Sequence, residues 1–318
     1  MKIVVFGPQQ RVGALAGEQI IDLNRAYARA NSPSAADERV PARLDAFIAG
    51  GQAVLDAAQQ AMDHASSTGP DGQVMFRAGE VNIHAPWPMR RIACAGGNYG
   101  EHLRGMESGG EASVEEVVRK ARERGQWGFW KVPAVVAGPD DEVPFPRHCT
   151  YFDYEGEAAI VLGKQGKDIP AGRLHEYVWG ITLLNDWSIR DGGMGHPFPM
   201  SYNLAKNFDM STSMGPCIVV GELQPEDVNV ELRVNGQVRQ KYNTRGMVFS
   251  FGEILEFLSR DFTFVPGDVI SGGTNVGTAA DQTKRGPDGR KPLDLFLKIG
   301  DTVELSSPSV GVVRNRIV

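Results

Sequence analysis

A pair of glutamates at the head of an apolar run constrains the fold of this chain more than any other feature. Glu155 and Glu157 flank Gly156, and five apolar residues, Ala158 to Leu162, follow directly. If this run is a strand, both carboxylates project from one face, roughly 6.5–7 Å apart along it. On a helix the same spacing would point them apart. Gly156 then leaves the opposite face without a side chain, so we expect another backbone to approach closely there.

A third carboxylate, Asp186, follows a second apolar stretch, Val178 to Leu184. The three acids have no adjacent His or Cys, and an all-oxygen ligand set suits Mg²⁺, Mn²⁺ or Ca²⁺ better than zinc. A Glu-x-Glu pair is also common on the solvated face of an edge strand, so the pattern alone leaves both interpretations open. We interpret the three carboxylates as the divalent metal site of an enzyme.

Length and composition narrow the function classes. A chain of 318 residues favours one large domain with a smaller partner, and Pro86-Trp87-Pro88 divides it into residues 1–85 and 86–318. A net charge of −6 argues against nucleic acid as a partner. No apolar run approaches the roughly 20 residues of a membrane span, and the N-terminus lacks a signal-peptide pattern. Three widely spaced cysteines predict neither a disulfide framework nor a zinc cluster. We expect a cytoplasmic enzyme.

The N-terminal segment is predicted to combine short strands with helices. Residues 2–6 and 19–23 have the pattern of strands around a turn-rich segment near 13–17. Apolar residues recur at helical spacing over 41–64, with a break at Gly50-Gly51, which predicts two short amphipathic helices.

The remainder is predicted to be mainly β. Asn235-Gly236 between alternating residues predicts a type I′ hairpin. Ser250 and Glu253 form a predicted capping box, and Ser113 with Glu116 predicts a second helix that ends near Gly125. Many strands with few helices predict an α+β, mainly β fold built as a sandwich or rolled sheet.

Several ordered motifs resemble the fumarylacetoacetate hydrolase family over residues 90–318, and residues 1–85 resemble its smaller N-terminal domain. The resemblance implies a mixed β-sandwich roll with a small N-terminal α/β domain, a bound Mg²⁺ or Mn²⁺, and a homodimer. The motifs that carry it include Gly96-Gly97-Asn98-Tyr99-Gly100-Glu101-His102, Asp153-Tyr154-Glu155-Gly156-Glu157, Asn185-Asp186-Trp187-Ser188-Ile189-Arg190-Asp191, Lys206-Asn207-Phe208-Asp209 and Gly273-Thr274.

The resemblance also implies roles for individual residues. Glu155, Glu157 and Asp186 match the family's metal ligands. Lys206 matches its active-site lysine, which holds an anionic oxygen near the metal, and His102 matches its general base, which activates water.

Two further residues are candidate substrate contacts. Lys131 resembles a family Phe-x-Lys-Pro segment, although a structural role fits it as well. Thr274 could offer its hydroxyl and backbone N–H to a substrate carboxylate, and the alternative is an ordinary Gly-rich turn.

The chain departs from the family pattern near the base. Relatives often place a glutamate three residues after the histidine, where this chain has Gly105, and a glutamine where it has Gly193. Glu101 or Glu107 could orient His102 instead, although neither matches by position. The segment 192–203 is expected to face the remote part of the substrate, and its uncharged residues suit a hydrophobic or aromatic tail.

Three functions follow as hypotheses. The first is hydrolysis of a C–C bond in a 2,4-diketo acid such as an acylpyruvate, with the metal holding the 2-oxo acid and His102 activating water. The second is decarboxylation of oxaloacetate, or tautomerisation of a 2-hydroxydienoate, on the same metal site. The third is a non-catalytic binder of metal and keto acid, which the complete set of site residues disfavours.

Overall fold

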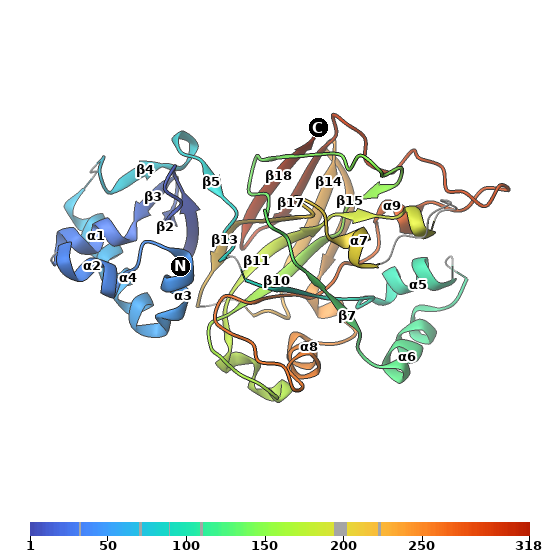
Figure 1. Cartoon of the computed structure of the whole chain (residues 1–318), viewed down its shortest axis with the longest axis horizontal. Helices are drawn as coiled ribbons and strands as arrows, with labels where there is room; N and C mark the ends of the chain where they lie inside the picture. Colours follow the sequence, from blue (N-terminus) through green and yellow to red (C-terminus); the bar gives the residue numbers. More distant parts are fainter. Residues whose placement is uncertain (32, 70–71, 89, 109–110, 194–201, 222–223) are drawn as a thin grey trace.

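The structure is a computed structural model that describes residues 1–31, 33–69, 72–88, 90–108, 111–193, 202–221 and 224–318. An N-terminal group of helices and short strands lies beside a larger body that contains two packed sheets (Figure 1). The mixed, mainly β fold predicted from the sequence is confirmed.

The N-terminal group agrees with the predicted elements in part. The predicted strands at 2–6 and 19–23 are β1 and β3, and the helical pattern over 41–64 is α3 and α4 with the predicted break at Gly50. The segment interpreted as turns is instead a strand, β2, because its apolar residues pair with β1 on one side and β3 on the other. The elements are β1 (Lys2–Phe6), β2 (Arg11–Ala16), β3 (Gln19–Asp22), α1 (Leu23–Ala30), α2 (Pro33–Arg39), α3 (Leu44–Ala49), α4 (Gly51–Thr68), β4 (Met75–Arg77), η1 (Ala78–Glu80) and β5 (Ile83–His84).

A large sheet runs through the whole molecule in the order β4-β3-β2-β1-β13-β11-β10-β16-β6-β7, with β5 paired to β1. Because β1 pairs with β13, the N-terminal strands extend the same sheet as the body. The division into residues 1–85 and 86–318 therefore stays a prediction. The strands of the body in this sheet are β6 (Ile92–Ala95), β7 (Gly128–Lys131), β10 (Gly156–Leu162), β11 (Val178–Asp186), β13 (Thr212–Val219) and β16 (Val269–Ser271).

A second sheet packs on one face of the body, in the order β15-β14-β17-β18-β8. The predicted hairpin joins β14 to β15, and Asn235 and Gly236 both have positive φ, as a type I′ turn requires. The strands are β8 (Glu142–Val143), β14 (Asn229–Val234), β15 (Gln237–Asn243), β17 (Thr302–Ser307) and β18 (Gly311–Ile317), and a separate pair is formed by β9 (Phe152–Asp153) and β12 (Ser188–Ile189).

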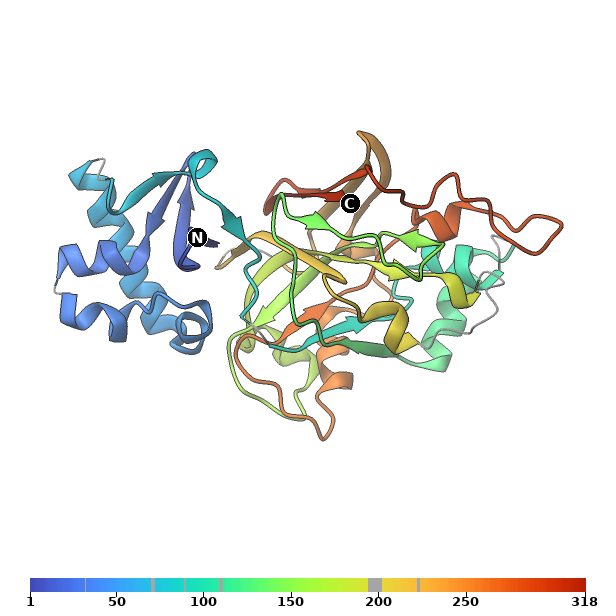
Figure 2. The same ribbon diagram turned by 45° about the horizontal axis from the view of Figure 1, so that its top comes forward.

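The helices of the body lie around the sheets, and α5, α6, α7 and α9 gather at the end remote from α1–α4 (Figures 1 and 2). The predicted capping box at Ser250 and Glu253 begins α8, and Ser113 caps α6 as predicted. No helix in the described part of the chain is long and apolar enough to cross a membrane. The helices are α5 (Gly100–Ser108), α6 (Val114–Arg124), η2 (Ala171–Glu176), η3 (Asp191–Gly193), α7 (Tyr202–Lys206), η4 (Thr244–Gly246), α8 (Phe251–Leu258) and α9 (Ala279–Gln282).

Alternation along β10 separates the two faces of the large sheet. Ala158 and Ile160 point into the core between the sheets, whereas Ala159 and Val161 point to the opposite face. Glu157 shares the parity of Ala159, so its carboxylate projects from the face that the second sheet does not cover. Glu155 directly precedes β10 and has the same parity, and its carboxylate approaches that of Glu157 within 4.8 Å, as expected for two side chains on one face.

Gly156 lies on the face that the second sheet covers. The expectation that another backbone approaches it closely is wrong. Side chains of the second sheet, rather than another backbone, approach it: a Cβ at Gly156 would lie 2.8 Å from Leu305 Cδ1 and 3.0 Å from Leu232 Cδ1. The glycine therefore lets the two sheets close over the start of β10.

We expect Gly156→Ala to lower the free energy of unfolding by about 1–3 kcal/mol, because the added methyl overpacks a closed core. Urea denaturation followed by circular dichroism measures this loss. Gly172→Ala is the matched control, because a Cβ at that position meets no heavy atom within 4 Å. Equal stability of the two variants would show that the sheets do not close as tightly as described.

Candidate active site

Three buried carboxylates meet where β10 begins and β11 ends. Glu157 pairs with Leu184 across these strands, and Asp186 N donates to Glu155 O at 2.9 Å, so the strand register brings Asp186 beside the glutamates. Ligand oxygens of Glu155, Glu157 and Asp186 all lie within 4.8 Å of one another, and each residue is at most 5% exposed. The alternative of a solvated acidic face does not fit this burial.

Cationic side chains contact two of these carboxylates. Lys206 Nζ donates to Glu155, to Asp186 and, at 2.6 Å, to Ser188 Oγ. Arg190 donates to Glu155 as well. Burial opposes ionisation of Glu155, but the charges of Arg190 and Lys206 outweigh it and lower the pKa of this carboxyl.

Glu157 is the exception in this balance of charges. Its carboxylate accepts a hydrogen bond from Ser271 Oγ. Burial, followed by repulsion from Asp186 and Glu155, raises its pKa well above the ordinary value. A divalent cation between the three carboxylates would supply the positive charge that Glu157 lacks. The all-oxygen donor set and the buried excess of negative charge therefore fit Mg²⁺ or Mn²⁺.

The carboxylates form part of the lining of a cavity of about 380 Å³. This volume lies within the range of pockets that bind small molecules. His102, Lys206 and Thr274 line the same cavity, so the fold brings together most of the residues that the sequence proposed. The remaining lining includes Ala95, Gly96, Gly97, Leu103, Met106, Arg124, Trp127, Phe129 and Arg190.

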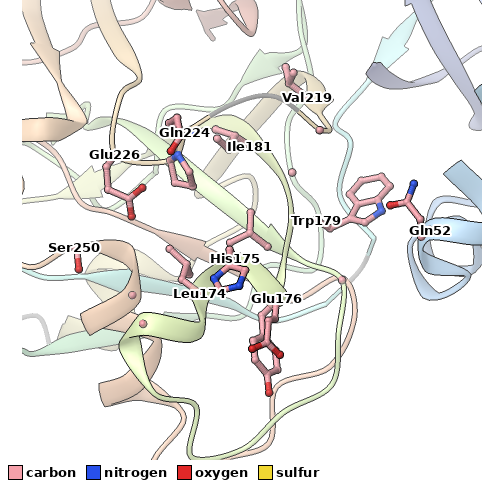
Figure 3. A pocket seen from close by; sticks show the side chains of 18 of the residues that line it. Gln52, Leu174, His175, Glu176, Trp179, Ile181, Val219, Gln224, Glu226 and Ser250 are labelled. Atoms are coloured by element: carbon pink, nitrogen blue, oxygen red, sulfur yellow. The ribbon is translucent and has the colours of Figure 1, made fainter. Parts of the chain in front are cut away.

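A larger cavity of about 630 Å³ lies elsewhere, against η2 and the start of β11, with Gln52 of α4 at its edge (Figure 3). It contains His175 and Glu176, but Glu176 is held in ion pairs with Arg173 and Lys164 on the surface. Size alone would favour this cavity. We assign the candidate site to the smaller one because the buried, charge-unbalanced carboxylates are there.

His102 lies on α5 and is 8% exposed. Its Nδ1 is 2.9 Å from Oδ2 of Asp281, which belongs to α9. Burial opposes protonation of the ring, but the Asp281 carboxylate outweighs it and raises the pKa of His102. Of the partners considered from the sequence, Glu101 pairs with Arg104 at 2.7 Å instead, and the side chain of Glu107 lies outside the described part.

Asp281 and Arg190 are the residues that sequence reasoning missed. Asp281 carries no signal near His102, because 179 positions separate the two residues. Arg190 is part of the Asn185–Asp191 motif, and an arginine four residues after a candidate ligand was a signal that could have been used.

The two predicted substrate contacts differ in position. Lys131 is fully buried, and its ammonium donates to Asp186 and, at 2.8 Å each, to the carbonyl oxygens of Lys206 and Ser211. It lies behind Asp186 and is not among the described residues that line the cavity. Thr274 does line the cavity, but its hydroxyl is engaged within the protein: it donates to Gly156 O at 3.0 Å and accepts from Gln240 Nε2 at 2.8 Å. Residues 194–201, within the predicted tail-binding segment, lie outside the described residues.

Two packed sheets with a buried carboxylate cluster define the class of fold, and comparison with known proteins identifies the family. The model of the fumarylacetoacetate (FAA) hydrolase C-terminal domain matches residues 91–318. The chain belongs to this family.

Relatives cover nearly the whole chain. Oxaloacetate tautomerase YisK of Bacillus subtilis (strain 168) is 32% identical over 306 residues, 94% of this chain and 93% of that protein. The human mitochondrial oxaloacetate tautomerase FAHD2B is 31% identical over 326 residues, 100% of this chain and 92% of that protein. The structure of maleylpyruvate hydrolase from Sphingobium sp. SYK-6, in complex with manganese(II) ion and pyruvate, has a TM-score of 0.72 and 20% identity, covering 100% of this chain and 99% of that one. At that identity the likeness concerns the fold.

We expect Mn²⁺ to raise the free energy of unfolding by about 2.7 kcal/mol when its concentration is 100 times the Kd, because it binds the folded carboxylate cluster. Glu157→Gln should abolish most of this gain and weaken Mn²⁺ binding measured by calorimetry. Glu142→Gln, at the exposed residue of β8, is the matched control and should behave as the parent does. Unchanged Mn²⁺ affinity in Glu157→Gln would exclude this residue as a ligand.

Proposed function

We propose that this chain is a divalent-metal-dependent enzyme that enolises a 2-oxo acid, and that keto–enol tautomerisation of a 2-oxo dicarboxylic acid such as oxaloacetate is its principal reaction. The observation that carries the proposal is one small cavity lined by a buried histidine, a buried lysine and three carboxylates that suit a cation. The names of the two tautomerases, which cover nearly the whole chain at 31–32% identity, support the choice of reaction.

Each side chain has a role in this proposal. Glu155, Glu157 and Asp186 would hold Mg²⁺ or Mn²⁺, which when bound orients the 2-oxo carboxylate group and stabilises negative charge on the keto oxygen. Nε2 of His102 takes the proton from C3 of the keto acid as the C3–H bond breaks. The same proton is returned to the former keto oxygen, which completes the enol and restores the neutral ring.

The cationic residues prepare the site for this charge movement. The Lys206 ammonium lines the cavity and stabilises the developing oxyanion, because electrostatic interactions strengthen in a buried environment. Lys131 holds Asp186 from behind, so we assign it a positioning role in place of direct substrate contact. The backbone N–H of Thr274 is the proposed donor to a substrate carboxylate.

A second candidate is hydrolysis of the C–C bond in a 2,4-diketo acid, with His102 activating water for attack on the distal carbonyl. One observation favours it: apolar side chains of Leu103, Met106, Trp127 and Phe129 line a cavity larger than a four-carbon acid needs. Such walls suit an acylpyruvate tail. A cytoplasmic location and a homodimer remain predictions for either reaction.

We expect the Mg²⁺-loaded protein to accelerate loss of the enol absorbance of oxaloacetate, and His102→Gln to reduce kcat by about 10²–10⁴-fold, because the base is removed. A panel of acylpyruvates, with pyruvate release as the readout, tests the second candidate in the same preparation. His175→Gln, in the exposed part of the larger cavity, is the matched control and should retain full activity.

Pyruvate and a carboxylic acid from acylpyruvates, without effect on oxaloacetate, would replace tautomerisation by hydrolysis. Carbon dioxide release from oxaloacetate would make the chain a decarboxylase. Full activity of His102→Gln on every substrate would contradict the role given to the histidine.

A further inference from the structure

The partner of His102 comes from a distant segment of the chain. His102 Nδ1 and Asp281 Oδ2 are 2.9 Å apart, and the two side chains are 10% and 1% exposed. Helices α5 and α9, which carry them, pack against each other. A hydrogen bond between two such buried groups fixes the orientation of the imidazole ring.

Gly105 provides the space that this carboxylate occupies. It lies three residues after His102 on the same helix, so a side chain there would lie on the same face as the histidine. A Cβ at Gly105 would be 3.2 Å from Asp281 Oδ1 and 3.3 Å from Asp281 Cβ. Any larger residue would therefore press on the carboxylate. A carboxylate at position 105 and one at position 281 would compete for the same place beside the ring.

Backbone groups contact one of the two carboxylate oxygens of Asp281, whereas Oδ1 has no hydrogen-bond partner among the described residues. Its Oδ2 accepts from the backbone N–H groups of Gly277 and Thr278, at 3.2 and 3.3 Å. Asp153 accepts from Ala279 N at 2.8 Å and Ala280 N at 3.1 Å, which anchors the start of α9.

The same anchor connects the His102–Asp281 dyad to the carboxylate cluster. Arg190 donates to Asp153 at 3.1 Å and also to Glu155. The position of α9, and with it Asp281, is thus coupled to a candidate metal ligand through two buried ion pairs.

We propose that Asp281 is the positioning residue of the base, replacing from α9 a carboxylate that α5 lacks at position 105. The inference rests on the proposed role of His102. By accepting a hydrogen bond from Nδ1–H, Asp281 keeps the lone pair on Nε2 and stabilises the ring once it is protonated.

The charges around the ring determine what removal of Asp281 does. Asp281 from α9 and Glu155 beside β10 favour the protonated ring, whereas burial and Arg190 after β12 disfavour it; Arg124 of α6 lines the same cavity. Loss of the Asp281 charge therefore lowers the pKa of His102. The neutral base then persists to lower pH, so the acid limb of kcat/KM moves to lower pH.

The test uses Asp281→Asn in the Mg²⁺-loaded protein. NMR titration of the His102 ring should give a pKa lower by about 1 unit, as expected for loss of an opposite charge in contact. The kcat should fall by about 10²-fold with little change in KM, because the ring is no longer held in the reactive tautomer. An unchanged His102 pKa, with turnover intact, would overturn the inference and leave the proposed function standing.

Two further variants separate positioning from folding. Thr278→Ala removes the hydroxyl that caps α9 but keeps the Asp281 carboxylate, so the His102 pKa should stay at the parent value. Gly105→Glu combined with Asp281→Ala moves the carboxylate to α5, and kcat should recover by at least about 10-fold over Asp281→Ala alone. Equal kcat in the double variant and in Asp281→Ala would contradict the proposal that Asp281 takes the place of a carboxylate at position 105.

The NMR arm requires no substrate. If the parent converts none of the keto acids but the Asp281→Asn shift is observed, the dyad is supported and the proposed reaction is wrong. The two failures are therefore distinguishable.

Discussion

Buried negative charge is the constraint on which the rest of the site depends. Glu155, Glu157 and Asp186 are almost fully excluded from solvent, and an unpaired carboxylate in such a place costs several kcal/mol. The chain offsets this cost with Lys131, Lys206 and Arg190, all of which contact the cluster. These cations belong to segments far apart in sequence, so the charge balance also holds β7, α7 and the residue after β12 around the ends of β10 and β11.

The compensation is incomplete at Glu157, and this imbalance is the feature of the cluster that fits a cation site. A network built only for stability would pair each carboxylate with a cation. Here Ser271 provides a neutral donor, and burial, followed by repulsion from Asp186 and Glu155, raises the pKa of Glu157. Removal of Lys131 would take away a buried cationic partner of Asp186, so this lysine is difficult to replace even though it is not among the described residues that line the cavity.

The sequence predicted the parts of the site that depend on local geometry. The two-residue period of a strand put Glu155 and Glu157 on one face. The end of the apolar stretch before Asp186 marked the end of the neighbouring strand. Both features depend only on residues that are close in sequence. The capping box at Ser250, the N-cap at Ser113 and the Asn-Gly hairpin were predictable for the same reason. Strand β2 was missed because its glycine and short apolar residues have the composition of a turn, and only pairing with β1 and β3 makes it a strand.

Asp281 could not have been predicted in the same way, because its role depends on the packing of α9 against α5. No spacing rule relates residues 102 and 281. From the sequence alone, Gly105 was only a departure from the family pattern, and the structure places the Asp281 side chain beside it. Lys131 illustrates the converse case. The sequence placed Lys131 among the substrate contacts, whereas in the structure its ammonium donates to Asp186 and lies outside the described lining of the cavity; a motif does not show on which side of a carboxylate an ammonium lies.

On the proposed function, the cavity has two parts, a charged part formed by the carboxylates and Lys206 and an apolar part formed by its walls. This difference explains how one site serves different reactions within a family. The charged part acts on the 2-oxo acid end of the substrate. Tautomerisation, decarboxylation and C–C hydrolysis all act on such an end, because negative charge of the enolate kind develops there in each reaction. The walls from α5 and the segment before β7 meet the other end of the substrate. Reaction choice then depends on whether these walls leave room for a water beside a second carbonyl, and not on the identity of the residues that hold the metal.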